Sequence, residues 1–162
     1  MDMPWLFMQH LKMLNNTKLN SSMKTEPFVI ERTFNASIEK VWNAITDRAE
    51  MKKWYFDLKE FKPEVGFEFR FDGGEDDRVY HHICKITEVV PGKKLTHSWR
   101  YDGYDGISFV TFELFEEGKQ TRVKLTHVGL ETFPQNSDFA KQNFVDGWTH
   151  IVGTSLKQFV ET

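Results

Sequence analysis

The spacing of hydrophobic and polar positions divides the chain into strands and helices. Residues 66–72 (GFEFRFD) alternate aromatic with charged side chains, a pattern typical of a strand with one buried face. Short segments with Pro-Gly or Glu-Gly turn residues separate the later apolar runs and predict two hairpins. The other predicted strands cover residues 28–34, 79–89, 95–101, 107–115 and 120–128.

Three segments have the apolar spacing of helices. Ser37 is an N-cap for a short amphipathic helix over residues 38–45, and Asp47 caps a second one over residues 48–53. From Asp138 to the C-terminus, apolar residues recur every three or four positions, which predicts a helix of about 20 or more residues.

This order of elements predicts an α+β fold. Connections of hairpin size imply an antiparallel sheet, and the final helix must bury its apolar stripe against the inner face of that sheet. A curved sheet around a long helix satisfies both requirements. The length of 162 residues fits one domain, which we place at residues 24–162.

We interpret residues 1–23 as an N-terminal extension outside this fold, with a short docked helix as the alternative. The chain starts with Asp2 rather than a basic region, which argues against a signal peptide, and Met23 is a candidate second start. No apolar run approaches the roughly 18 residues of a membrane span. We therefore expect no membrane span.

Charge and cysteine content exclude further classes of function. The 21 basic and 24 acidic residues give a net charge of −3 with no basic cluster, so nucleic acid is not an expected partner. Cys84 is the single cysteine and cannot form an internal disulfide, which favours a cytoplasmic location.

Alternation predicts which side chains share the inner face of the sheet. If Ile86 points inward, His82 and Cys84 do so too, and His97 and His127 approach the same interior from other strands. Aromatic side chains joined to a few polar groups are typical of ligand cavities, although the same side chains could fill a solid core. The predicted cavity residues are Trp54, Phe69, Phe71, Tyr80, His82, Cys84, His97, Trp99, Phe112, His127, Phe144 and Trp148.

We predict no catalytic residue, metal or cofactor among them. The histidines lack the HxH or HExxH spacing of a metal site, and no GxSxG motif is present. Cys84 has apolar neighbours and is expected to be an unreactive small hydrophobe. Acid-base catalysis by the inward histidines is the enzymatic alternative.

Six motifs in one order resemble the START-related (SRPBCC) superfamily. Within it, the chain is similar to the C-terminal domain of the activator of the 90-kDa heat-shock protein's ATPase. The resemblance covers residues 27–162. The motifs are SIEKVWNAITD at 37–47, Lys53-Trp54, the aromatic strand after Gly66, residues 88–99, TRVKLTH at 121–127 and Gly147-Trp148.

The resemblance implies a helix-grip (START-like, Bet v 1-like) fold, with a seven-strand sheet and a cavity that holds apolar molecules in related proteins. Together with the inner-face residues, it leads us to expect a non-catalytic protein that binds a small hydrophobic or aromatic ligand. We expect a monomer or homodimer. A protein-protein interaction module of co-chaperone type is the alternative, and a cyclase- or hydrolase-like enzyme is a third reading.

Overall fold

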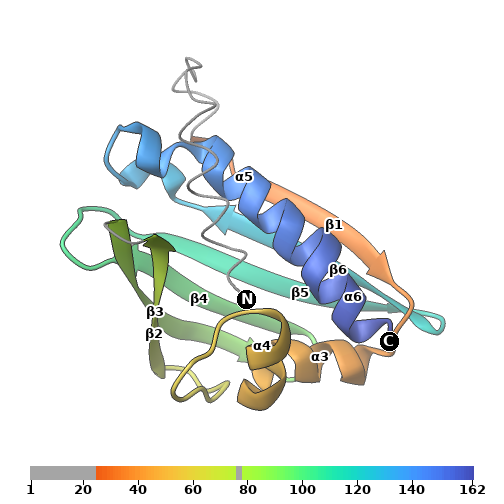
Figure 1. Cartoon of the computed structure of the whole chain (residues 1–162). Coiled ribbons are helices and arrows are strands. Elements are labelled where there is room, and N and C mark those ends of the chain that lie inside the picture. The colour runs from red at the N-terminus through yellow and green to blue at the C-terminus, as the bar shows by residue number, and fades with distance from the viewer. Residues whose placement is uncertain (1–24, 76–77) are drawn as a thin grey trace.

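The computed structural model describes residues 25–75 and 78–162, so the predicted extension lies outside the described residues. A six-stranded antiparallel sheet and helices on one of its faces make up the described chain (Figure 1). The strands are β1 Phe28–Phe34, β2 Glu68–Glu75, β3 Arg78–Val90, β4 Lys94–Tyr101, β5 Ser108–Glu117 and β6 Gln120–Val128. The helices are α3 Ile38–Thr46, α4 Arg48–Trp54, α5 Lys141–His150 and α6 Lys157–Val160.

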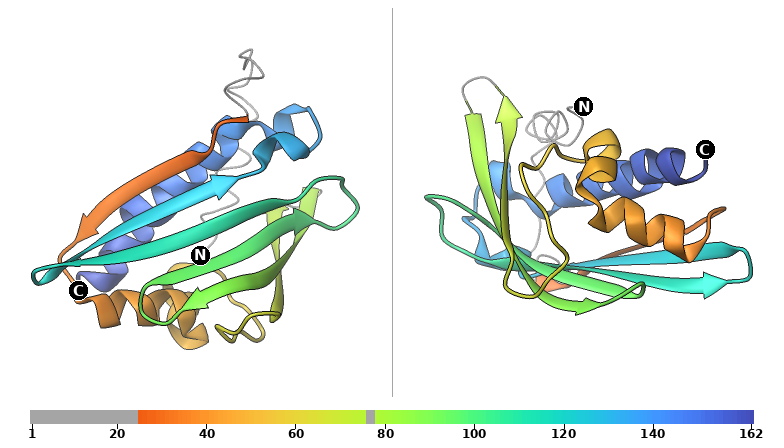
Figure 2. Two further views of the ribbon diagram at one scale, coloured as in Figure 1. Left: turned by 180° about the vertical axis from the view of Figure 1, so that it is seen from behind. Right: turned by 90° about the horizontal axis from the view of Figure 1, so that it is seen from below.

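The sheet has the order β1-β6-β5-β4-β3-β2, so β1 and β2 are its two edges. Figure 2 shows the sheet curving toward the helices, with the C-terminal helix lying across its concave face. This is the predicted α+β helix-grip fold. The resemblance implied seven strands, whereas the sheet of the described residues has six. From the sequence, residues 58–63 are the segment that could supply a seventh strand, but they are irregular, and Leu58 and Phe61 are buried in the core.

Both predicted N-caps are confirmed. The Ser37 side chain accepts a hydrogen bond from the amide of Lys40, and the Asp47 side chain accepts one from the amide of Glu50. Each cap satisfies an amide that the first turn of the helix leaves without a partner. The two short helices consequently start one after the other and close one end of the sheet.

The C-terminal helix begins later than its apolar spacing predicts. Asn136 caps a separate 3-10 turn at Ser137–Phe139, and the continuous helix starts only at Lys141. Its middle, Ile151–Leu156, widens to a π-helix before α6. The stripe of Phe144, Trp148 and Val152 is buried against the sheet, as the periodicity predicts.

The consecutive glycines Gly73 and Gly74 predict a loop from the sequence, and the structure shows that this prediction is wrong. Both lie in β2, where Gly73 pairs with Tyr80 and Gly74 with Val79. Two glycines usually indicate a turn, but here the ladder continues through them. Gly74 has a φ of 127°, and a Cβ there would lie 1.9 Å from the carbonyl oxygen of Arg78. The strand needs glycine because β3 passes so close.

The predicted inner face of the sheet is confirmed. Alternate residues of β5 and β6 are buried, and the buried set continues through Leu95, His97 and Trp99 of β4. Ile86 is 1% exposed, so β3 has the orientation that the inner-face prediction required. None of the helices in the described part of the chain is long and apolar enough to cross a membrane.

Candidate functional site

An open groove of about 860 Å³ runs between β2 and the segment that follows α4. We call it the β2 groove. Its position follows from the topology, because β2 is an edge strand and the chain between α4 and β2 passes beside it without pairing. Residues from both faces of β2 therefore line the groove.

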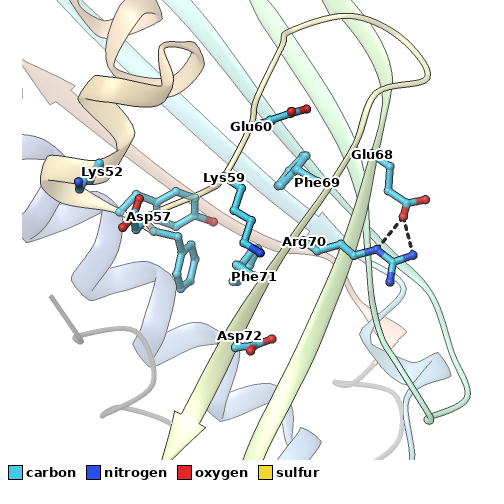
Figure 3. A pocket seen from close by; sticks show the side chains of 11 residues that line it. Lys52, Asp57, Lys59, Glu60, Glu68, Phe69, Arg70, Phe71 and Asp72 are labelled. Atoms are coloured by element: carbon cyan, nitrogen blue, oxygen red, sulfur yellow. Dashed lines mark hydrogen bonds and ion pairs between the residues drawn. The ribbon is translucent and has the colours of Figure 1, made fainter.

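The β2 groove has an aromatic floor and a charged rim. The floor consists of the buried Tyr55, Phe56, Phe69 and Phe71. The rim consists of exposed charged side chains, which Figure 3 shows around the opening: Lys52, Asp57, Lys59, Glu60, Glu68, Arg70 and Asp72. Three of these side chains are cationic and four are anionic, so the rim has no strong preference for one sign of charge.

Stacked rings extend the floor into the core. Phe56 stacks on Phe71 with 3.8 Å between ring centroids, and Phe71 stacks on His82 at 4.4 Å. Behind them, His82 contacts Trp99 edge to face. Offset and edge-to-face contacts of this kind add to the stabilisation that area burial provides. The floor is therefore continuous with the aromatic core behind it.

A second, enclosed space of about 10 Å³ lies deeper in the core. Tyr55 and Phe69 line both this space and the β2 groove, so they form the wall between the two. The remaining lining residues are Ile45, Met51, Trp54, Phe61, Leu95, His97 and Phe112. Charged side chains do not take part in this lining.

The hydroxyl of Tyr55 is buried without a hydrogen-bond partner in the described structure. Burial raises the pKa of Tyr55 well above its ordinary value, and electrostatic repulsion from Cys84 and Tyr101 raises it further. The group is therefore a neutral O–H that points into the core. Nearly all buried polar groups in folded proteins have a partner, so this exception needs an explanation.

His127 belongs to a complete hydrogen-bond chain. The indole N–H of Trp148 donates to His127 Nδ1 at 2.9 Å, which leaves Nε2 to carry the proton and donate to Ser108 Oγ at 2.8 Å. Ser108 in turn donates to the backbone oxygen of Trp99. Both ring nitrogens are used, so His127 positions the C-terminal helix on the sheet.

The other two inward histidines donate to backbone oxygens. His82 Nδ1 lies 3.0 Å from the oxygen of Tyr80, and His97 Nδ1 lies 2.9 Å from that of Ser98. Burial lowers the pKa of each to about 4 and lowers that of His127 to about 3. All three imidazoles are neutral at pH 7.

Tyr80 lies near the start of β3 and connects this strand to the 3-10 turn before α5. Its hydroxyl donates to Asp138, which also accepts from Arg78 Nη1 at 2.9 Å. Burial, followed by the hydrogen bond to Asp138, raises the pKa of Tyr80. This contact holds the start of the C-terminal helix against the sheet.

The twelve predicted cavity residues are all buried in one interior. Phe69 and Phe71 lie in the groove floor, and Trp54, Phe69, His97 and Phe112 line the enclosed space. The remaining seven do not line either of these two hollows within the described residues. Contact with a ligand stays a prediction for all twelve.

Sequence reasoning missed Tyr55 and Phe56 as site residues. They follow the last turn of α4, where neither helical nor strand periodicity applies, so their pattern does not show which way they point. Three consecutive aromatic residues, Trp54 to Phe56, were the available signal. Asp138 was missed because its partner Tyr80 is 58 residues away along the chain.

Cys84 should be unreactive in the native protein. It is 0% exposed, and burial raises the pKa of its thiol well above the ordinary value, so the nucleophilic thiolate is absent near neutral pH. We expect no reaction with Ellman's reagent at pH 8 without denaturant, and one thiol per chain in 6 M guanidinium chloride. Fast labelling of the native protein would contradict this prediction.

In the described part of the chain, no three His, Cys, Asp or Glu side chains gather in a way that could hold a metal ion. The β2 groove offers apolar contact and ring stacking at its floor and charged side chains at its rim.

Three solved structures share this fold. A protein from Chromobacterium violaceum is 20% identical with a TM-score of 0.71, and the match covers 84% of this chain and 97% of that chain. A protein from Bacillus halodurans is 27% identical with a TM-score of 0.65, covering 84% and 97%. A protein of the dynemicin biosynthetic locus is 22% identical with a TM-score of 0.67, covering 84% of this chain and 47% of that chain.

A search of curated proteins gives no significant match. A family model does match, over residues 35–161, and this range includes both short helices, five of the six strands and the C-terminal helix. The chain belongs to the family described as Activator of Hsp90 ATPase homolog 1-like protein.

Proposed function

We propose that this protein binds a small hydrophobic or aromatic molecule in the β2 groove without catalysing a reaction. The observation that carries the proposal is the aromatic floor of an open groove of about 860 Å³, formed by four buried aromatic residues. Ligand pockets usually have volumes of about 300–1,000 Å³ and mostly apolar linings with a few polar groups. The charged rim would orient the ligand, while the floor supplies affinity through apolar burial.

The arrangement of the three inward histidines argues against acid-base catalysis and so favours a binding protein. Each has a backbone or side-chain hydrogen bond at Nδ1, and desolvation holds each neutral. A general acid or base works best with a pKa near the operating pH, whereas these pKa values are about 3 to 4. A cytoplasmic location and a monomeric or dimeric state remain predictions from the sequence.

Binding should raise the melting temperature in the presence of an aromatic probe. With 2-acetylnaphthalene at about ten times its Kd, mass action stabilises the folded state by about 1.4 kcal/mol, which corresponds to roughly 3–6 °C for a chain of this size. Differential scanning fluorimetry measures the shift. Native mass spectrometry of the purified protein would show whether an apolar molecule is already bound.

Two phenylalanine variants locate the binding site. Phe56→Ala removes part of the floor and should reduce the probe-induced shift, whereas Phe115→Ala, on the outer face beneath Arg122, should leave it unchanged. The shift is compared with each variant's own melting temperature without probe. Equal shifts in Phe56→Ala and the wild type would argue against this groove.

A protein partner is the second candidate, because β2 is an edge strand and forms one wall of the same groove. An extended peptide can add to such an edge through backbone hydrogen bonds. A protein-binding module would show no thermal shift with small aromatic probes, so the same measurement separates the two candidates.

A further inference from the structure

The hydroxyl of Tyr55 is the most unusual polar group in the described core. Tyr55 is 5% exposed, and its oxygen is the one buried side-chain N or O atom without a hydrogen-bond partner in the described structure. Leaving a buried hydroxyl unpaired costs about 1–3 kcal/mol, and phenylalanine would fill the same space without that cost. A functional partner would explain why tyrosine stands here.

The place of Tyr55 suggests where that partner would come from. The centroid of its ring lies 4.3 Å from that of Phe56 and 6.4 Å from that of Phe71, both in the groove floor. The ring centroid of Trp148 in α5 is 6.5 Å away. With Phe69 it separates the β2 groove from the enclosed space. A group that enters from the groove between Tyr55 and Phe69 would therefore pass along the Tyr55 side chain into the core.

The Tyr55 side of this wall does not belong to the sheet. Tyr55 ends α4 and starts a segment without regular secondary structure that runs to β2. One bond that holds this segment joins Arg48 Nε to the backbone oxygen of Leu58 at 2.7 Å. Phe69, the other residue of the wall, lies in β2, where it pairs with Cys84 of β3.

The enclosed space restricts the chemistry of the entering group. Its volume of about 10 Å³ lies at the lower limit for one water molecule, and its polar lining groups beside Tyr55 are His97 and the indole of Trp54, which already donates to Ala44. No Lys or Arg lines it, so an anion would lose its hydration without a compensating charge. A small neutral acceptor fits this surrounding.

We propose that Tyr55 donates its hydrogen bond to a carbonyl oxygen, or an equivalent neutral acceptor, at the buried end of the ligand in the β2 groove. This inference rests on the proposed function and adds the class of ligand: an aromatic or apolar molecule with an uncharged acceptor at one end. The apolar body lies on Phe56, Phe69 and Phe71, and the acceptor points toward Tyr55.

Two probes of the same shape test the inference. In 2-acetylnaphthalene the side group carries a carbonyl, and in 2-isopropylnaphthalene a methyl group replaces that oxygen. Titrations followed by tryptophan fluorescence give the Kd of each probe for the wild type, Tyr55→Phe and the control Tyr104→Phe, whose tyrosine is 45% exposed. Tyr55→Phe should raise the Kd of the acetyl probe about five- to tenfold. The Kd of the isopropyl probe should stay the same or fall slightly. The control should change neither Kd.

The apo protein gives an independent readout. Without probe, Tyr55→Phe should melt a few degrees higher than the wild type, because it removes a desolvated group that lacks a partner. A lower melting temperature would show that the Tyr55 hydroxyl has a favourable partner in the apo protein, and would overturn the inference. Equal effects of Tyr55→Phe on both probes would overturn it while leaving the proposed function intact. If neither probe binds the wild type, the proposed function fails as well.

Discussion

The protein should unfold cooperatively in mild acid, between about pH 5.5 and pH 4. His82, His97 and His127 are neutral in the folded state, with pKa values of about 4, 4 and 3, against 6.5 for an unperturbed histidine. Desolvation is the main cause for all three. The unfolded chain therefore binds more protons than the folded one over this range, and its population rises as the pH falls.

The sign and size of the effect follow from proton linkage. The contribution of each histidine to stability is fully present above pH 6.5, falls as the pH drops toward the folded pKa, and does not fall further below it. One proton changes the unfolding free energy by about 1.4 kcal/mol per pH unit, so three acting together approach about 4 kcal/mol per unit. At this slope below pH 6.5, a stability of about 5–10 kcal/mol, the lower part of the typical range of about 5–15 kcal/mol, would be lost between about pH 5.5 and pH 4.

Urea titrations at pH 7.5, 6.5, 5.5 and 5.0, followed by tryptophan fluorescence, measure this slope. His97→Asn keeps a donor for the Ser98 carbonyl but removes one titrating ring, so its slope should fall by about a third. Phe115→Ala on the outer face removes no titrating group and is the control, so its slope should match that of the wild type. Unfolding free energies that are constant from pH 7.5 to pH 5.0 would contradict the assignment of three neutral buried imidazoles.

These histidines also show how far the sequence determines the site. Period-two alternation was enough to place His82, His97 and His127 on the inner face, because the strands keep their alternation at these positions even though the β3–β4 pairing has a bulge at Ile86–Glu88. Their hydrogen-bond partners were not predictable. The contact between Trp148 and His127 joins a helix to a strand, and its geometry depends on how the helix lies on the sheet.

The groove depends on features that have no local signal. Its floor combines Phe69 and Phe71, which alternation placed correctly, with Tyr55 and Phe56, which lie in an irregular segment. Which strand forms the edge of the sheet decides where the groove opens, and strand order is a property of long-range pairing. The sequence therefore predicted the interior well and its opening poorly.

The substitution Gly106→Ala should destabilise the protein far more than Gly103→Ala in the same β4–β5 connection. Gly106 has a φ of 108°, and a Cβ there would lie 2.4 Å from the backbone oxygen of Thr132 and 2.8 Å from the ring of Phe133. Gly103 has a φ of 84° but no atom within 4 Å of the added Cβ. Both variants introduce a left-handed backbone strain of about 1–2 kcal/mol, and only Gly106→Ala adds a steric clash.

We expect Gly106→Ala to lose about 3–5 kcal/mol of unfolding free energy, measured by urea denaturation, and Gly103→Ala only about 1–2 kcal/mol. The clash cannot relax easily, because Thr132 Oγ1 accepts a hydrogen bond from the amide of Ile107 and Phe133 is 2% exposed within the core. Equal losses in the two variants would show that this connection moves independently of Thr132 and Phe133. A large difference would show that Thr132 and Phe133 hold this end of the core rigidly against the β4–β5 connection.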